Sequence, residues 1–274
     1  MHTQTAGGQR LRTLRKYYGK TQLDVELEAN LGTGYLQRVE TGRVKQPEQY
    51  TLERILVALS ASYNERRETL ACFGYLVDAP IPDAGEIAWA INHCQAELDH
   101  AFFPAYLLDC AHRLLAWNRP APHLWGDGAT SASGVYASML NLVFDTSSRF
   151  GQGIANPDAF LPAQIRALRY EWQWFQDEPW YKALLDEMMR LPRFHHYWTL
   201  MADELTPFPA RPLTELIFAP PDEPRLTFRL VSERFVTDQR FRIIYLLPAD
   251  TATTEQCWRW QAEAGASPQP GDDL

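Results

Sequence analysis

The chain has 274 residues, 46% of them hydrophobic, which is enough for one large domain or two ordinary ones. It contains no run of about 18 apolar residues, so we expect no membrane-spanning helix. The net charge of −8 is unevenly divided: residues 1–45 carry eight Lys or Arg against four acids, or +4, leaving −12 for the remainder. A basic first part on an acidic body is typical of a protein in which only the first part binds nucleic acid.

The cysteines and the first residues indicate a reduced, cytoplasmic setting. The four cysteines are scattered, without a Cys-x-x-Cys pair or a metal-ligand spacing. Buried reduced thiols are expected, and a redox-sensing pair is the alternative. The first eight residues lack both the basic and the apolar parts of a signal peptide. We therefore expect a cytoplasmic protein with no metal site.

Residues 21–43 predict two short helices joined by a tight turn. Thr21 is placed to cap the first helix through the amide of residue 23 or 24. Val25 and Ala29 are four residues apart and share its apolar face. Asn30 tolerates the left-handed conformation and is the expected pivot of the turn.

The second helix of this pair has the composition of a DNA-reading helix. It is expected to begin at Gly32 or Thr33, with Leu36 and Val39 facing the first helix. Arg can pair bidentately with guanine, and Gln with adenine. The opposite face then presents Thr33, Gly34, Gln37 and Arg38.

Apolar residues at helical spacing predict three more helices around this pair. One precedes it, with Leu11 and Leu14 on its buried face. Two follow, over residues 52–59 and near 70–73. Five short helices of this kind form a small bundle. The alternative is an ordinary helical bundle whose Thr, Gly and Arg residues are only surface residues.

The bundle resembles a known family of DNA-binding domains. Thr21-Gln22, followed by Tyr35-Leu-Gln-Arg-Val-Glu-Thr-Gly-Arg43, is similar to the Xre and phage-repressor family, in which Glu-x-Gly closes the recognition helix. The resemblance implies an all-α helix-turn-helix bundle like that of λ repressor. It implies base contacts by Thr33, Gly34 and Arg38, with Gln37 beside them, and phosphate contacts by Gln22, Arg43 and Lys45.

Two residues depart from the family pattern. Glu26 stands where the family has a small residue packed between the helices. Gly34 has no side chain with which to read a base. Discrimination between sequences is therefore expected to depend on Arg38 and on the shape of the DNA.

Prolines and a glycine mark a boundary after the fifth helix. Pro80, Pro82 and Gly85 are followed by an amphipathic pattern over 83–100, which predicts a helix that could act as a lever or a dimer contact. The predicted parts are a DNA-binding domain at 1–78, a connecting helix at 79–103, a larger domain at 104–250 and a C-terminal tail at 251–274.

The larger domain reads as strands, then helices, then strands. This order predicts an α+β layer with the helices on one side of an antiparallel sheet. The predicted strands are 103–109, 112–118, 213–218, 225–231 and 240–246, and the predicted helices are 135–147, 163–176, 180–190 and 193–203.

A second resemblance covers about residues 104–247. Pro104-Ala-Tyr-Leu-Leu-Asp109, Leu114-Leu-Ala-Trp-Asn118 and Leu124-Trp-Gly-Asp127 resemble the ligand-binding domain of MmyB-type bacterial regulators. Residues 141–144 and 194–198 match more loosely. The resemblance implies a PAS-like fold with a pocket for a small, largely apolar effector, of which a fatty acid is one example.

The aromatic residues of this domain predict either a core or a ligand pocket. Large aromatic side chains bury much area, and they also line apolar ligand sites. Core packing is the simpler interpretation of each residue taken alone. His112 is a candidate polar anchor for a ligand. The predicted pocket residues are Trp117, Asn118, Trp174, Tyr197, Trp198, Arg166 and Arg169.

The sequence contains no catalytic pattern. His195 and His196 are adjacent, so on a helix they point about 100° apart and cannot easily share a metal. Gly151-x-Gly153 is placed in a loop and lacks the rest of a dinucleotide fingerprint. We therefore expect a protein that is not an enzyme and has no cofactor.

The leading hypothesis is a sequence-specific bacterial transcription regulator. It would act as a homodimer on a palindromic double-stranded DNA operator and respond to a small apolar effector. The alternative is a constitutive DNA-binding protein whose larger domain only dimerises or recruits a partner protein. An enzyme tethered to DNA is the least favoured hypothesis.

Overall fold

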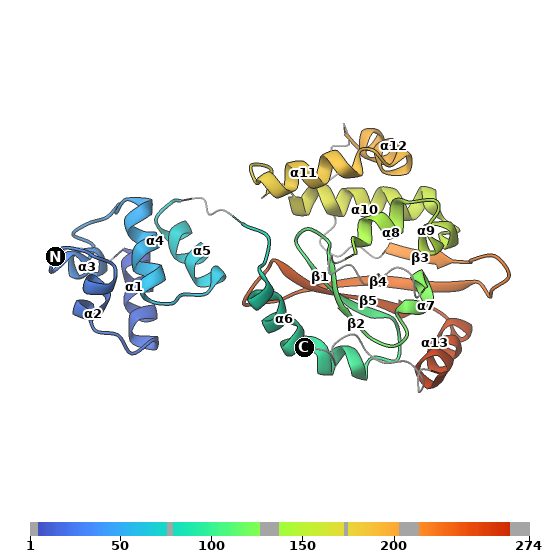
Figure 1. Ribbon diagram of the computed structural model, residues 1–274, viewed down its shortest axis with the longest axis horizontal. Helices are drawn as coiled ribbons and strands as arrows, with labels where there is room; N and C mark the ends of the chain where they lie inside the picture. The colour runs from blue at the N-terminus through green and yellow to red at the C-terminus, as the bar shows by residue number, and fades with distance from the viewer. Residues whose placement is uncertain (1–4, 76–78, 127–136, 173–174, 203–213, 264–274) are drawn as a thin grey trace. The chain divides into compact units, whose positions relative to one another are not determined.

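The computed structural model divides the chain into two compact units, Met1–Asp78 and Ala79–Leu274, each described here by itself (Figure 1). Among the described helices, none has both the length and the apolar character that a bilayer crossing requires. The structure describes residues 5–75, 79–126, 137–172, 175–202 and 214–263.

The first unit is entirely helical in its described part. Its core is formed by leucines and branched aliphatic residues that recur at helical spacing, so each helix buries one face. The five predicted helices are confirmed. They are α1 (Ala6–Tyr17), α2 (Gln22–Glu28), α3 (Tyr35–Glu40), α4 (Gln49–Ala58) and α5 (Tyr63–Cys72).

Local signals define both ends of α2. The Thr21 hydroxyl accepts a hydrogen bond from the amide of Asp24, whose carboxylate accepts one from the Thr21 amide in return. This reciprocal cap satisfies two amides that the helix leaves open. Asn30 adopts a left-handed backbone with φ of 48°. The predicted cap and the predicted pivot are both confirmed.

The start of α3 differs from the prediction. The helix begins at Tyr35 rather than at Gly32 or Thr33, because Gly34 is left-handed with φ of 78° and interrupts the chain direction there. Only glycine adopts that conformation without steric cost. Thr33 and Gly34 therefore lie in the turn before the helix and not on its face.

Glu26 caps α3 from the neighbouring helix. Its side chain is buried, with 4% exposed. Oε2 accepts a hydrogen bond of 2.9 Å from the amide of Gly34, and Oε1 accepts one of 2.8 Å from the amide of Leu36. The carboxylate satisfies amides that would otherwise lack partners, at the helix end that favours negative charge. This role gives a structural reason for a buried acid at position 26.

Glu40 joins the first three helices. The Arg15 guanidinium donates to it through Nε at 2.6 Å and through Nη2 at 2.9 Å. Gln22 donates to the same carboxylate at 2.8 Å. The hydrogen bonds that Arg15 donates to Glu40 raise the pKa of Arg15. Because Glu40 is buried, these donors hold α1, α2 and α3 at fixed distances from one another.

The second unit is an α+β domain built on a five-stranded antiparallel sheet. The strand order β2-β1-β5-β4-β3 is compatible with the predicted PAS-like fold. All five predicted strands are present. They are β1 (Ala105–Asp109), β2 (Leu114–Trp117), β3 (Thr214–Phe218), β4 (Leu226–Arg234) and β5 (Phe241–Pro248).

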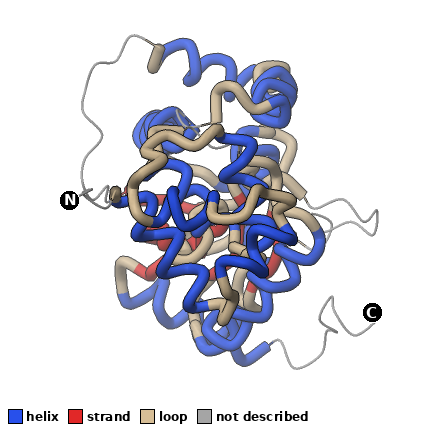
Figure 2. Tube along the Cα trace, turned by 90° about the vertical axis from the view of Figure 1, so that its left-hand side faces the viewer, coloured by secondary structure: helices blue, strands red, loops and turns tan. Residues whose placement is uncertain are grey.

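Helices cover both faces of this sheet (Figures 1 and 2). Side chains of one strand alternate between faces, so Leu246 and Ile244 of β5 pack with the later helices while Ile243 packs against α6. The helices are α6 (Ala84–His100), α7 (Pro122–Trp125), α8 (Met139–Phe144), α9 (Arg149–Gly153), α10 (Pro157–Trp172), α11 (Pro179–Met188), α12 (Pro192–Leu200) and α13 (Thr251–Glu263).

Two predictions about this domain are wrong. Helices were expected on one side only, but α6 covers the second face with Ile87 and Leu98 buried against the strands. That apolar face is occupied within the domain and is not open to a dimer contact. The predicted tail at 251–274 contains α13, whose Cys257 and Trp260 join the main core. In the sequence, an amphipathic helix followed by polar residues looks like an exposed tail, because the pattern does not show the sheet that this helix covers.

The capping role of Glu26 can be tested by the variant Glu26→Ala. The loss leaves two amides without their acceptor, so we expect the first unit to lose about 1–3 kcal/mol of unfolding free energy. Glu28→Ala is the control, because Glu28 makes a half-exposed ion pair with Lys20 worth at most about 1 kcal/mol.

Urea unfolding followed by far-ultraviolet circular dichroism measures this loss. All nine tryptophans lie beyond residue 78, so their fluorescence reports the second unit alone and should not change. Equal stability of the two variants would contradict the capping role.

Candidate functional site

The turn before α3, the helix itself and the loop after it form an exposed polar surface. Gln37 and Arg38 are exposed on the helix, and Thr33 is exposed in the turn. The Arg38 guanidinium lies 5.7 Å from the centroid of the Tyr35 ring. Arg43 and Lys45 are exposed in the loop that follows. The structure therefore places these predicted base-reading and phosphate-binding side chains in solvent.

Gln22 lies instead in a polar groove of about 480 Å³ beside this surface. Its amide donates to Glu40, so part of its hydrogen-bonding capacity is already used. Gln37 lines the same groove. Arg12 and Lys20, which the sequence patterns did not single out, add positive charge to it. Arg12 belongs to α1 and Lys20 to the segment that follows it, so only the packing of the bundle brings them beside Gln22 and Gln37.

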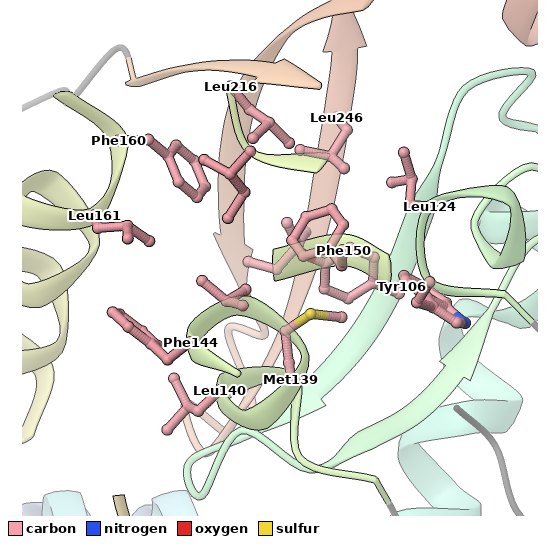
Figure 3. Packing of buried hydrophobic residues seen from close by; sticks show 14 of the residues in the cluster. Tyr106, Leu124, Met139, Leu140, Phe144, Phe150, Phe160, Leu161, Leu216 and Leu246 are labelled. Atoms are coloured by element: carbon pink, nitrogen blue, oxygen red, sulfur yellow. The ribbon is translucent and has the colours of Figure 1, made fainter. Parts of the chain in front are cut away.

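The second unit contains a cavity of about 380 Å³ between the sheet and the helices α8, α9 and α10. Its size is within the range of small-molecule sites. Most of its wall is apolar. Figure 3 shows side chains from this wall, which include Tyr106, Met139, Leu140, Phe144, Phe150 and Phe160.

A cluster of polar side chains interrupts the apolar wall. Glu171 of α10 accepts a hydrogen bond from Arg242 of β5 and lies 3.4 Å from the guanidinium of Arg234 of β4. The second terminal nitrogen of Arg242 contacts the His112 ring, most closely at Nε2 and at 3.0 Å from Nδ1. We call His112, Glu171, Arg234 and Arg242 the polar cluster.

The protonation states of the polar cluster follow from its contacts. Burial and the charge of Arg242 lower the pKa of His112 to about 4, against the opposing effect of Glu171. Arginine can only donate, so a ring nitrogen of His112 must accept, which requires the neutral ring. Burial raises the pKa of Glu171, but Arg242 and His112 lower it further, so the net shift is downward. The cluster therefore holds a carboxylate and a neutral imidazole.

The backbone at His112 is unusual. Its φ of 58° is left-handed, a conformation in which non-glycine residues are uncommon. Two backbone bonds hold the turn: the His112 amide donates to Asp109, and the amide of Met139 donates to the His112 carbonyl. The turn between β1 and β2 thereby places the His112 imidazole in the cavity wall.

The predicted pocket residues on β2 do not line this cavity. Asn118 is buried and its amide is fully engaged by the backbone. It accepts from Ala105 at 2.9 Å and donates to the carbonyls of Ala101 and Phe103 at 2.9 and 2.7 Å. Trp117 packs edge-on against Trp125. Both residues fix the β1–β2 region and its connection to α6.

The predicted pocket residues on the later helices also lie elsewhere. Tyr197 donates to Asp158 at 2.7 Å. Trp198 stacks on Phe194, and the Arg169 guanidinium lies over the Trp198 ring, 4.1 Å from its centroid. These aromatic residues pack against one another, as the simpler interpretation expected. Arg166 is half-buried on α10 away from the cavity lining, and Trp174 lies outside the described residues.

Three members of the polar cluster were missed by the sequence patterns. Arg242 gave a usable signal, because it is a single charge within the otherwise apolar run from Phe241 to Leu247. Glu171 and Arg234 gave none, since acids on helices and arginines at strand ends are ordinary. His112, suggested as a polar anchor, does line the cavity.

Residues beside the polar cluster hold the segment that enters the domain. Arg113, next to His112, donates to the carbonyl of Pro82 at 2.9 Å. Arg240 donates to the carbonyl of Pro80 at 3.1 Å and forms an ion pair with Glu86. The start of α6 is therefore fixed by the turn that carries His112 and by the turn that precedes β5, the strand of Arg242.

The glycines at 151 and 153 have a packing role. They lie in the short helix α9 and not in a loop as predicted. A Cβ atom on Gly151 would meet the Asp145 carbonyl at 2.1 Å, and one on Gly153 would meet the Phe218 ring at 2.3 Å. Both positions need glycine because neighbouring groups approach the backbone closely.

The remaining reactive side chains form no site in the described part of the chain. Cys94, Cys110 and Cys257 are buried, and burial raises the pKa of each thiol. Cys72 is exposed, unlike the prediction of buried thiols. The described residues contain no cluster of His, Cys, Asp and Glu that could hold a metal ion.

The family comparison identifies the larger unit. Residues 94–259 match the family described as the MmyB-like transcription regulator ligand binding domain, over more than half of the chain. The chain belongs to this family. The MmyB-like domain contains all five strands, the cavity and the polar cluster.

Other comparisons add little. A solved structure described as an RNA-binding light-oxygen-voltage receptor shares 12% identity with the chain at a TM-score of 0.28. The match covers 93% of this chain, which spans 62% of the length of that receptor. A likeness this weak carries no argument. Comparison with curated proteins gives no match.

The neutral state of His112 predicts an acid-sensitive domain. Unfolded histidine takes up a proton as the pH falls below 6.5, whereas folded His112 does so only near pH 4. The unfolding free energy should therefore fall by about 2 kcal/mol between pH 6.5 and 4.5. The lowered pKa of Glu171 adds a further loss only below 4.5, its ordinary value.

Thermal unfolding followed by tryptophan fluorescence across this pH range measures the effect. His112→Asn should flatten the dependence, because asparagine tolerates the left-handed backbone and does not titrate. His195→Gln, at an exposed position on α12, should behave like the unmodified protein. A His112→Asn profile as steep as that of the unmodified protein would rule out this origin of the acid sensitivity.

Proposed function

We propose that the chain is a DNA-binding transcription regulator whose MmyB-like domain binds a small, largely apolar effector. The observation that carries the proposal is the largely apolar 380 Å³ cavity inside a domain whose family is a regulator's ligand-binding domain. Water finds few hydrogen-bond partners in such a cavity, whereas an apolar molecule that enters it removes its own surface from water. A fatty-acid-like molecule is one candidate.

The first unit supports the DNA-binding half of the proposal. Its α2 and α3 are short, joined by a turn with two left-handed residues, and fixed by the buried carboxylates of Glu26 and Glu40. A rigidly held short helix with exposed Gln37 and Arg38 suits the major groove. Gly34 and Thr33 approach the DNA from the turn. Arg43 and Lys45 then bind phosphates beside it.

Regulation follows from unequal binding of the effector to two arrangements of the protein. A ligand shifts such an equilibrium only by the difference in its affinity for the two. We propose a homodimer on a palindromic operator, in which occupancy of the cavity changes how the two DNA-binding units are presented. The family and the absence of a catalytic pattern in the sequence favour a protein that is not an enzyme.

Arg38→Ala tests the DNA interface. Binding sites are first selected from random double-stranded DNA, and affinities for selected and scrambled duplexes are then compared by fluorescence anisotropy. The variant should lose about 1–3 kcal/mol of preference for the selected site. Arg67→Ala, which removes the same charge from α5, should keep that preference. Loss of equal size in both variants would show that Arg38 does not read bases.

The ligand-binding half has its own test. Mass spectrometry of solvent extracts from the purified protein should detect a bound apolar molecule. Ala163 lines the cavity, so Ala163→Trp should fill it and abolish that binding while the domain still unfolds cooperatively. Equal ligand content in the variant and the unmodified protein would place the ligand elsewhere.

A further inference from the structure

The second unit begins with a short segment whose backbone is held by side chains of the same unit. We call residues Ala79–Pro82 the entry segment, because they directly follow the last residue of the first unit. The Ala79 amide donates to Glu178, and the indole of Trp180 donates to the Ala79 carbonyl at 2.8 Å. Both side chains come from the start of α11. Ala79 is itself buried, so this end of the entry segment is fixed against α11.

Two arginines hold the rest of the entry segment. Pro80 and Pro82 have no amide hydrogen, and their rings fix φ at about −65°, so the segment is stiff and offers only carbonyl groups at these positions. Arg240 donates to the Pro80 carbonyl at 3.1 Å. Arg113 donates to the Pro82 carbonyl at 2.9 Å. The entry segment is therefore bound by α11, by the β1–β2 turn and by the turn that precedes β5.

Carboxylates hold both arginines in place. Arg240 is 2% exposed and forms ion pairs with Asp238 and Glu86. Arg113 forms an ion pair with Asp109, whose side chain is fully buried. Burying a charge is costly unless it is paired and hydrogen-bonded. Because each guanidinium spans a carboxylate and a carbonyl, the position of the carbonyl depends on the position of the carboxylate.

The first of these arginines shares a rigid turn with a residue of the cavity wall. The Asp109 carboxylate accepts from the amides of Ala111 and Arg113 at 3.0 and 2.9 Å, one on each side of His112. His112 lines the cavity, whereas Arg113 holds the entry segment. A displacement of the His112 ring is therefore passed to Arg113 through a turn that has little freedom of its own.

The second connection leads from the cavity through the start of β5. Only Phe241 separates Arg240 from Arg242, and its ring is fully buried in the cluster that joins β5 to α6. Arg242 lines the cavity and donates to Glu171 and to His112, but its buried Nε has no partner among the described residues. An occupant that contacts Arg242 or His112 changes the partners of these groups. It thereby acts on both turns that hold the entry segment.

We propose that the entry segment transmits occupancy of the cavity to the DNA-binding unit, with Arg113 and Arg240 as the positioning residues that couple the two. This inference rests on the proposed function and names the structural element of its regulation. An occupant changes the affinity for DNA only if it binds one position of the entry segment better than another. DNA must then change the affinity for the occupant by the same factor.

A double titration of the full chain measures this factor. Fluorescence anisotropy gives the affinity for the selected duplex with and without saturating dodecanoate, below its aggregation limit. Titration calorimetry gives the affinity for dodecanoate with and without the duplex. In the unmodified protein we expect the two ratios to agree and to be about fivefold or more, in either direction.

Variants assign the coupling to the entry segment. The double variant Arg113→Lys, Arg240→Lys keeps both positive charges beside their carboxylates but loses the forked guanidinium that also reaches a carbonyl. It should bring the factor to within about twofold of one and leave each separate affinity within about twofold. Trp180→Phe keeps a ring and removes only the donor to Ala79, so it should reduce the factor by about half or more. This variant decides the matter if the double variant fails to fold.

The matched control is Arg149→Lys. Arg149 also joins a carboxylate to a backbone carbonyl, since it pairs with Glu223 and donates to the His123 carbonyl at 3.1 Å. Because it does not touch the entry segment, this variant should keep the full factor. Loss of coupling in Arg149→Lys would overturn the assignment to the entry segment.

The outcomes separate this inference from the proposed function. If the unmodified protein shows the coupling and the double variant and Trp180→Phe keep it in full, the inference alone is overturned. If dodecanoate and DNA both bind but do not affect each other, regulation through the cavity fails, and the inference fails with it. If either one does not bind at all, the proposed function itself fails.

Discussion

The contact of Glu171 with Arg242 and Arg234 is the interaction on which the larger unit depends. It joins α10 to the neighbouring strands β4 and β5 across one side of the cavity. Without the carboxylate, two guanidinium groups would oppose each other on adjacent strands in a poorly hydrated space. Breaking a buried pair of this kind by removing one partner costs about 3–5 kcal/mol. The same contact leaves positive charge beside an apolar cavity, so the stability of the layer and the chemistry of the cavity have one source.

The first unit uses buried carboxylates in the same way. Glu26 reaches from α2 to the amides at the start of α3, and Glu40 receives donors from α1 and α2. Each acid replaces the lost water with donors from other segments, which makes its position specific. These buried contacts therefore fix the turn before α3 and the helix itself, while the side chains of Gln37 and Arg38 are exposed. That separation suits a surface that must present fixed groups to a second molecule.

The segment that follows the first unit is attached where the cavity is charged. Arg113 and Arg240 hold the carbonyls of Pro82 and Pro80, and each lies within two residues of a member of the polar cluster. The strained turn at His112 and the start of β5 thus contribute to two sets of contacts at once. In the larger unit, the parts that would meet a ligand and the parts that fix the start of α6 are neighbours in the chain.

Much of this protein could be predicted from its sequence, because those features depend on neighbouring residues. The five helices of the first unit, the Thr21 cap, the Asn30 pivot and all five strands follow from local propensity and apolar spacing. The motif from Pro104 to Asn118 identified a family that residues 94–259 match. The residues that line the cavity were predicted less well from the sequence. Most of the aromatic residues predicted to line it pack against other aromatic residues instead, and the side chain of Asn118 forms hydrogen bonds with backbone groups.

What only the tertiary structure decided are contacts between residues far apart in the chain. Arg242 and His112 meet across 130 positions, and Arg242 and Glu171 across 71. Spacing patterns carry no information about such pairs. The same holds for Glu26, whose capping role depends on the amides of Gly34 and Leu36, and for α6, whose apolar face is buried only once the sheet has formed. Sequence determined the elements and the family; packing determined which charged side chains are buried together beside the cavity, because such contacts join residues that are far apart in the chain.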